Sequence, residues 1–556
     1  MRNPSLKTLS AATLGAAALV AATASTHFAH ADVKPNSLFS DNAVLEGGVE
    51  IPVWGTARDG ENVTVQIADQ KVSTIAKGGV WQVQLKPLQS ADALTMTITG
   101  DNTVTAKNIL VGDVWVCSGQ SNMQFALNQA SNATSELPKA DDPQLRLFLV
   151  PGKYAVNPQT DTAGRWVLCT PATAAGFTAV GYFFGRDLRA HLKRPVGLIG
   201  SYWGGTPAQS WTSIEALQSN PPFADYVAGH KAVADPYPQQ EAAYAGKMAD
   251  YQAAVKQWNV DNGEAWAATM KDYNAAAAQA RAAKLPPPPR PVPPKPMPLM
   301  PRDPEGGPGV ASELYNGMIA PLIPYAIKGA IWYQGESNEG RGKEYATLFP
   351  RMITDWRTRW NQGDFPFLFV QLPLYRAAVD MPVQSSGWID IRESQQKTLA
   401  LPNTGMAVTI DVGDPPNIHP KDKMDVGDRL ALIARHVAYG EDLVYTGPTY
   451  DSMKVEGNKI RINFKNTGSG LTISAPPWMA DGSAPPVPTD ITGFAISGAD
   501  KKWSVGKAQI DGNSVLVWSD EVAAPTAVRY AWKTNPQADL YNKEGLPAAP
   551  FRTDMD

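Results

Sequence analysis

The 556-residue chain contains only two cysteines, Cys117 and Cys169, so disulfide bonds do not provide its scaffold. Each lies in an apolar, strand-like stretch, which favours two buried thiols, with a single bridge between them as the alternative. The sequence has no Cys-x-x-Cys pair and no His-Glu-x-x-His motif, which argues against a zinc site. We therefore expect a fold held together by its hydrophobic core.

An excess of charge of one sign is also lacking. Lys and Arg number 49 and Asp and Glu number 53, for a formal net charge of −4. No long basic run is present, so nucleic acid is not an expected partner. Hydrophobic residues make up 43% and charged residues 18%, which excludes a disordered, collagenous or coiled-coil chain. The length suggests about three to five globular units.

Beyond the N-terminus, no apolar run reaches the roughly 18 residues that a membrane span needs. The N-terminus has Arg2 and Lys7, then an apolar stretch over residues 11–22, then Ala-His-Ala at residues 29–31. This order is typical of a signal peptide with its cleavage site. We expect residues 1–31 to be removed and the protein to be exported to the periplasm or secreted, without membrane attachment. An uncleaved membrane anchor is the alternative.

The pattern of apolar residues divides the chain. Residues 32–108 alternate apolar and polar residues in short runs between Gly, Asn and Asp, which predicts a β-sandwich domain. Residues 109–445 alternate apolar runs with helical stretches, which is typical of an α/β domain with a parallel sheet. Residues 446–556 return to short β segments and predict a second β domain.

Residues 215–305 interrupt the α/β pattern. Aromatic and apolar residues recur there at spacings of three and four, which predicts an amphipathic helical arm. A proline-rich stretch follows and predicts an extended return strap. Packing of the aromatic stripe against the main domain is the simpler interpretation, and a substrate-binding face is the alternative.

Polar loops follow four of the apolar runs in the α/β region. They are residues 118–122, 201–205, 334–338 and 411–419. In a doubly wound sheet, ligands bind at the carboxyl ends of the strands, so we expect these loops to form one site.

Two residues in these loops are candidates for nucleophilic catalysis. Of six histidines, two lie in the expected signal peptide and three in helical stretches or the arm, which leaves His419 as the candidate general base. Ser121 follows a strand and a glycine, and the residues after it can begin a helix whose amides stabilise negative charge. A helix-capping serine is the alternative for Ser121.

Three ordered blocks carry a resemblance to a known family. Residues 111–123 read VGDVWVCSGQSNM, residues 332–338 read WYQGESN, and residues 418–421 read IHPK. Together with both terminal β regions, they resemble the sialate O-acetylesterase family, an SGNH-type group of carbohydrate esterases. The resemblance covers nearly the whole chain after residue 31.

The resemblance implies an SGNH-hydrolase-like doubly wound parallel sheet with flanking β domains. It implies a serine esterase that removes acetyl groups from sugar hydroxyls through an acetyl-enzyme, with no metal or other cofactor. Ser121 is then the nucleophile and His419 the base. The implied oxyanion hole consists of the Ser121 amide, an amide of Gly204 or Gly205, and the side chain of Gln334.

The third member of the triad departs from the SGNH pattern. Position 416, three residues before His419, is Pro, and position 417, often Asp in the family, is Asn. We rank Asp414 first as the residue that orients His419, a backbone carbonyl second and Asp411 third.

Four further residues are candidates for substrate binding. Trp203 and Trp332 offer flat apolar faces to a sugar, with core packing as the alternative. Glu336 and Asn338 lie in the second block, and their alternative role is to fix loop geometry.

An O-acetylated glycan is the expected partner, and the sequence does not indicate the oligomeric state. We expect acetylated xyloglucan or xylan from plant cell walls as substrate, with sialate 9-O-acetyl esters as the alternative. A lipase or thioesterase, and a non-catalytic glycan-binding protein on an esterase scaffold, are the competing classes.

Overall fold

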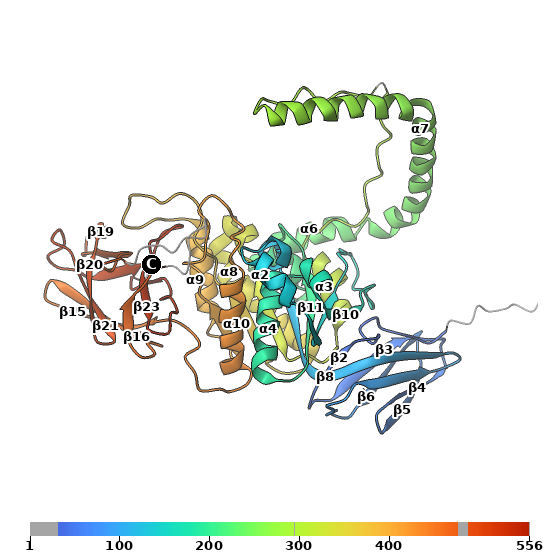
Figure 1. The fold of residues 1–556 in the computed structure, drawn as a ribbon, viewed down its shortest axis with the longest axis horizontal. Helices are drawn as coiled ribbons and strands as arrows, with labels where there is room; N and C mark the ends of the chain where they lie inside the picture. The colour runs from blue at the N-terminus through green and yellow to red at the C-terminus, as the bar shows by residue number, and fades with distance from the viewer. Residues whose placement is uncertain (1–31, 294, 476–487, 555–556) are drawn as a thin grey trace, which may run out of the picture.

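The computed structural model describes residues 32–293, 295–475 and 488–554, and Figure 1 shows how its elements are arranged. The expected signal peptide, residues 1–31, lies outside the described residues. Within the described ranges, no helix combines the length and the apolar character that crossing a membrane requires.

The N-terminal β region ends in a strand that continues into the main sheet. In β4, Val63, Val65 and Ile67 are buried and alternate with more exposed residues, as period-two side-chain direction requires. The longest strand, β8, pairs with β7 near its start and with the parallel sheet near its end. The strands are β1 (Lys34–Pro35), β2 (Val44–Glu46), β3 (Ile51–Thr56), β4 (Asn62–Ile67), β5 (Gln70–Ile75), β6 (Val80–Leu85), β7 (Leu94–Thr99) and β8 (Thr103–Gly119).

The main sheet has the strand order β10-β9-β11-β8-β12-β13-β14. All neighbours are parallel except β10, which pairs antiparallel with β9. Strands that follow β8 in the sequence lie on both sides of it, which confirms the predicted doubly wound sheet. The other strands are β9 (Asp142–Leu149), β10 (Trp166–Cys169), β11 (Val196–Tyr202), β12 (Gly329–Tyr333), β13 (Phe367–Val370) and β14 (Thr404–Ala407).

Two pairs of packed helices cover this sheet, α4 with α10 and α8 with α9. The first pair approaches closely at Gly427, where an added Cβ would lie 2.5 Å from the Cβ of Phe183. The helices of this region are α1 (Ser121–Gln124), α2 (Ala133–Glu136), α3 (Pro171–Ala175), α4 (Ala179–Leu192), α8 (Gly342–Trp360), α9 (Gly387–Thr398) and α10 (Met424–Val437).

The inserted segment forms an arm that leaves the α/β body, bends, and returns as a chain without helix or strand (Figure 1). Its helices are α5 (Ile214–Gln218), α6 (Ala224–Ala234) and α7 (Tyr237–Ala282). This confirms the predicted helical arm and its proline-rich strap. One residue of the aromatic stripe, Trp258, packs within the arm: its buried indole donates a hydrogen bond of 3.1 Å to the carbonyl of Lys295 in the strap.

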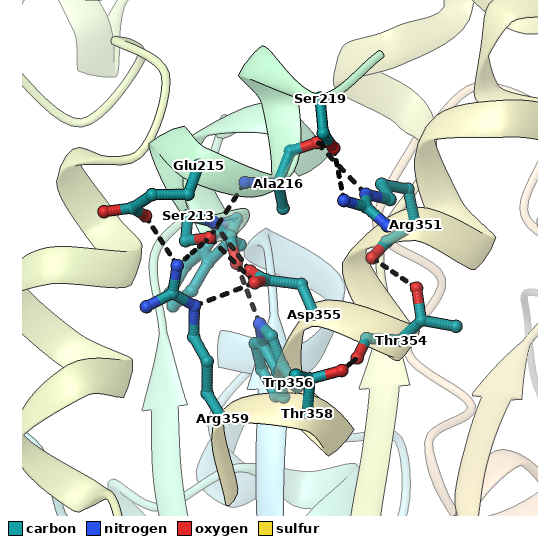
Figure 2. A network of polar contacts seen from close by, with 11 residues as sticks. Ser213, Glu215, Ala216, Ser219, Arg351, Thr354, Asp355, Trp356, Thr358 and Arg359 are labelled. Carbon is teal, nitrogen blue, oxygen red and sulfur yellow. Dashed lines mark hydrogen bonds and ion pairs between the residues drawn. The ribbon is translucent and has the colours of Figure 1, made fainter.

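A polar network anchors the base of the arm to α8, as Figure 2 shows. The carboxylate of Asp355 accepts hydrogen bonds from the Ser213 amide (2.8 Å) and the Ser213 hydroxyl (2.7 Å) at the start of α5. Arg359 donates to the same carboxylate at 2.8 Å. The indole of Trp356 donates to the carbonyl of Trp211 at 2.9 Å. The insertion therefore begins from a fixed point on the main domain.

The C-terminal region is all β. Sheet β15-β16-β21-β20 begins with a hairpin whose turn contains Gly457 at φ +65°, a conformation that favours glycine. A second sheet has the order β19-β18-β22-β24, and β17 pairs with β23. The strands are β15 (Thr449–Glu456), β16 (Lys459–Lys465), β17 (Leu471–Ile473), β18 (Phe494–Ser497), β19 (Trp503–Val505), β20 (Lys507–Asp511), β21 (Ser514–Trp518), β22 (Ala527–Tyr530), β23 (Leu540–Asn542) and β24 (Phe551–Arg552).

The two cysteines are both buried and unbridged, so the alternative of a disulfide between them is wrong. Cys117 lies in β8 and Cys169 ends β10. Burial raises the pKa of both thiols, because a thiolate loses its hydration there.

A buried ion pair joins the α/β region to the C-terminal β region. Arg429 in α10 donates two hydrogen bonds to the carboxylate of Asp411, at 2.6 and 2.7 Å, and the Asp411 side chain is fully buried. The hydroxyl of Tyr541 in β23 donates to the same carboxylate at 3.2 Å. Both carboxylate oxygens of Asp411 are therefore already hydrogen-bonded, to Arg429 and Tyr541.

We predict that Asp411→Asn lowers the free energy of unfolding by about 3 to 5 kcal/mol, because it leaves the Arg429 guanidinium buried without its counter-charge. Urea unfolding followed by tryptophan fluorescence measures this change. Asp520→Asn serves as the control, because the Lys507–Asp520 pair is exposed and such pairs contribute at most about 1 kcal/mol. An equal effect of both substitutions would contradict the prediction.

Candidate active site

The carboxyl ends of three central strands meet at one point of the sheet. Gly119, the last residue of β8, lies opposite Tyr202 of β11 and Tyr333 of β12. Its φ of +139° and its packing both require glycine, because an added Cβ would lie 2.2 Å from the carbonyl oxygen of Tyr333. The loops that follow these strands converge here, as their sequence pattern predicted.

Ser121 and His419 form a hydrogen-bonded pair at this point. Ser121 is the first residue of α1, and His419 lies in the loop between β14 and α10. The distance from His419 Nε2 to Ser121 Oγ is 2.8 Å. The His419 backbone amide donates to the side chain of Asn417 at 3.0 Å, and the Asn417 amide donates to the carbonyl of Asp414 at 3.0 Å. A compact turn therefore holds the imidazole against the serine.

The imidazole of His419 is half-buried and has a lowered pKa. Partial burial is the larger cause and the positive charge of Lys423 the second, and both disfavour the imidazolium form. The ring therefore stays neutral, able to accept a proton, at a lower pH than an exposed histidine.

Among the described residues, no carboxylate is hydrogen-bonded to His419. Asp414 Oδ1 is buried and has no hydrogen-bond partner there, and no bond joins it to the imidazole. Asp411 is held by Arg429 and Tyr541. The arrangement seen is thus a serine–histidine pair.

A pocket of about 660 Å³ opens beside the pair. This volume is in the range of small-molecule sites. It contains both polar and apolar groups, and it is open to solvent on one side. Its lining residues are Ser121, Gln124, Phe125, Ala126, Gln129, Leu149, Val150, Pro151, Gly152, Gly176, Tyr202, Trp203 and His419.

Trp203 is the predicted aromatic contact that the structure places in this pocket. Its ring makes an edge contact with Tyr154, with centroids 5.8 Å apart. The chain at Gly152 passes so close that an added Cβ would lie 2.8 Å from the ring. These contacts hold Trp203 in a fixed orientation at the wall of the pocket.

Gly204 lies directly against the serine. An added Cβ there would be 3.3 Å from the Cβ of Ser121, and the Gly204 amide donates to Gln124 Oε1 at 2.8 Å. Gly205 follows with φ +74°. The β11 loop thus places Gly204 against the Ser121 side chain.

The structure does not bring the other predicted contacts into the pocket. Gln334 is fully buried, and its amide donates to the carbonyl of Thr206 (3.3 Å) and the side chain of Asn338 (2.7 Å). Trp332 is buried against Trp211 and other core aromatics. Glu336 and Asn338 are buried as well. Burial within the protein separates these side chains from a ligand.

The sequence analysis missed two residues of the site, Asn122 and Lys423. Both are buried directly beneath the pair, and the ammonium of Lys423 donates to Asn122 Oδ1 at 2.6 Å. The adjacent motifs contained the signal: Asn122 follows the candidate nucleophile, and Lys423 is four residues after the candidate base.

Comparisons with known proteins show which chains this one resembles. A family model described as "Carbohydrate esterase, sialic acid-specific acetylesterase" matches residues 307–434. Sialate O-acetylesterase from Rattus norvegicus is 31% identical, covering 90% of each chain. The Homo sapiens protein of that name is 29% identical, covering 90% of this chain and 88% of its own. The crystal structure of a carbohydrate acetylesterase from Xanthomonas citri superposes with a TM-score of 0.72 at 35% identity, covering 94% of this chain and 100% of its own.

We predict that kcat/KM for ester hydrolysis falls in acid with a midpoint below about 6.5, the ordinary pKa of histidine. A histidine base must be neutral to accept a proton, and burial together with Lys423 lowers the pKa of the His419 imidazole. A lowered pKa moves the loss of activity to lower pH. A pH profile with p-nitrophenyl acetate measures the midpoint, and a value above 7 would contradict the assignment.

Proposed function

The chain belongs to the sialate O-acetylesterase family and is a carbohydrate O-acetylesterase, and from that premise we propose that Ser121 and His419 are its catalytic residues. The observation that carries this proposal is the 2.8 Å hydrogen bond between His419 Nε2 and Ser121 Oγ at the wall of the pocket. A nucleophile and a base within this distance meet the geometric requirement for acyl transfer.

The reaction follows from this geometry. Ser121 Oγ attacks the acetyl carbonyl carbon while His419 Nε2 takes the hydroxyl proton. The tetrahedral intermediate collapses, the sugar oxygen leaves with the proton from His419, and the acetyl group stays on Ser121. Water then attacks the carbonyl carbon of the acetyl-enzyme and gives a proton to His419. The second tetrahedral intermediate collapses, Ser121 Oγ leaves with the proton from His419, and acetate is released.

The oxyanion hole is best supported by backbone groups. The Ser121 amide is at the start of α1, and Gly204 of the β11 loop lies against Ser121. The Gly204 amide is donated to Gln124 Oε1, so we assign the glycine donor to Gly205. Removal of one such donor typically costs about 2.7 to 4 kcal/mol of transition-state stabilisation. We assign Gln334 a supporting role, because its amide hydrogens are donated to Thr206 and Asn338.

For the third triad position, the geometry favours a pair without a carboxylate over the triad with Asp414. The Asp414 carboxylate makes no hydrogen bond to His419 in the described structure, and no carboxylate contributes to the pKa of the imidazole. The turn through Asn417 holds the backbone of His419 instead.

We predict that Asp414→Asn lowers kcat by less than about tenfold, because this carboxylate does not contact the base. An acid that orients a catalytic histidine costs about 10⁴-fold when it is changed to the amide. Steady-state kinetics with His419→Ala as the reference measures the difference. A loss of 10²-fold or more would restore Asp414 to the triad.

The proposed substrates are acetylated plant cell-wall glycans such as xyloglucan or xylan. Trp203 presents a fixed aromatic wall in an open pocket, which suits a glycan, and the Xanthomonas citri protein, 35% identical to the chain, is a carbohydrate acetylesterase. The named relatives favour sialate O-acetyl esters as the second candidate. Export of the enzyme to where such glycans occur stays a prediction from residues 1–31.

We predict that the protein releases acetate from acetylated xyloglucan oligosaccharides or xylan faster than from O-acetylated sialosides. Acetate release measures this, with Ser121→Ala as the control, because loss of the nucleophile lowers kcat by at least about 10³-fold. Faster release from sialosides would establish the second candidate. Release that persists in Ser121→Ala would contradict the catalytic assignment.

A further inference from the structure

A fully buried ammonium group lies next to the candidate catalytic pair. Lys423 immediately precedes α10 and is 0% exposed. Its Nζ donates to Asn122 Oδ1 and lies 5.0 and 5.2 Å from the ring centroids of Phe125 and Tyr333. Burial of a cation is costly unless it has polar or aromatic partners. Packing alone therefore does not account for a lysine at this position.

The acceptor of this hydrogen bond connects the two halves of the pair. Asn122 directly follows Ser121, and its Nδ2 donates to the carbonyl of Ile418, the residue before His419, at 3.0 Å. The same Nδ2 donates to Glu336 Oε1 at 2.5 Å. Both ends of the Asn122 amide are therefore held, one by Lys423 and the other by Ile418 and Glu336.

We propose that Lys423 is a positioning residue of the esterase: it fixes the Ser121–His419 geometry through Asn122, and it places a buried positive charge beside the pair. This inference rests on the proposed roles of Ser121 and His419 and goes beyond them. In a Ser-His-Asp triad the acid orients the histidine. Here we give part of that role to the cation of Lys423.

Burial and two nearby carboxylates have opposite effects on the pKa of Lys423. Glu336 and Asp422 act on the ammonium from the β12 loop and from the adjacent residue, and His419 lies on the side of the pocket. Burial lowers the pKa of Lys423 to about 7, against the opposing effect of the two carboxylates. Burial also raises the pKa of Glu336, so its carboxylate is a weakened counter-charge.

The sign of the effect on His419 follows from this balance. At the acidic pH where His419 titrates, Lys423 is protonated, because its pKa is about 7. A cation next to an imidazole disfavours the imidazolium and keeps the base neutral further into acid. Tyr333 also faces the ammonium, and burial raises its pKa, so it stays uncharged in this range.

The test uses Lys423→Met, which keeps the length of the side chain and removes its charge. We expect the acid midpoint of kcat/KM to rise by about one pH unit and kcat to fall about 10- to 100-fold, because Asn122 loses one of its anchors. KM should change little, since Lys423 does not line the pocket. Lys421→Met is the matched control, because that side chain is exposed two residues away.

Two further variants separate position from charge. Lys423→Arg keeps the charge and should keep the midpoint near the wild-type value. Asn122→Ala removes the anchored amide but leaves the cation, so kcat should fall while the midpoint stays in place. Thermal unfolding of each variant identifies any that is not folded.

An unchanged midpoint in folded Lys423→Met would overturn the inference, as would an equal shift in Lys421→Met. A shift in Asn122→Ala as large as in Lys423→Met would also overturn it, because charge would then not be the cause. Ser121→Ala and His419→Ala, measured in parallel, keep the two proposals apart. If these two remain active, the proposed catalytic pair fails; if they are inactive and Lys423→Met behaves like wild type, only the role of Lys423 fails.

Discussion

The close approach of Gly119 to the carbonyl of Tyr333 is the constraint on which the rest of the site depends. Because no side chain separates these strand ends, the loops after β8 and β12 start side by side, and the β11 loop joins them on the other side of β8. Ser121 is two residues beyond this contact. The position of Ser121 is restricted by the central strand, because β8 is hydrogen-bonded to the N-terminal β region as well as to the parallel sheet.

The electrostatics beneath the site differ from those of a serine–histidine–aspartate triad. There the acid favours the imidazolium, whereas here the charged group that acts on His419 is the ammonium of Lys423, which disfavours it. The proton transfer must then rely more on geometry, and the structure supplies it through the Asn417 turn and the doubly held Asn122 amide. In the proposed mechanism, transition-state stabilisation then comes largely from the backbone amides around Ser121.

Much of this arrangement could be predicted from the sequence, because it depends on local patterns. Apolar runs that end in Gly- and Ser-rich loops predict the parallel sheet, and the scarcity of histidine singles out His419. Burial at the ends of loops could not be predicted in the same way. Gln334 and Trp332 belong to the motif that marks the site, yet their side chains point into the protein. Lys423 was missed because its burial arises from three loops that are distant in sequence.

The arm has a consequence for how this architecture can change. Both of its ends are fixed at the body: the first through Asp355, and the second where the backbone amide of Val156 donates to the carboxylate of Glu305. Between these anchors, a helix of 46 residues, about 69 Å of contour, contributes no strand to the sheet. The segment is thus a module in the topological sense, one that evolution can lengthen, shorten or replace while the catalytic register is preserved.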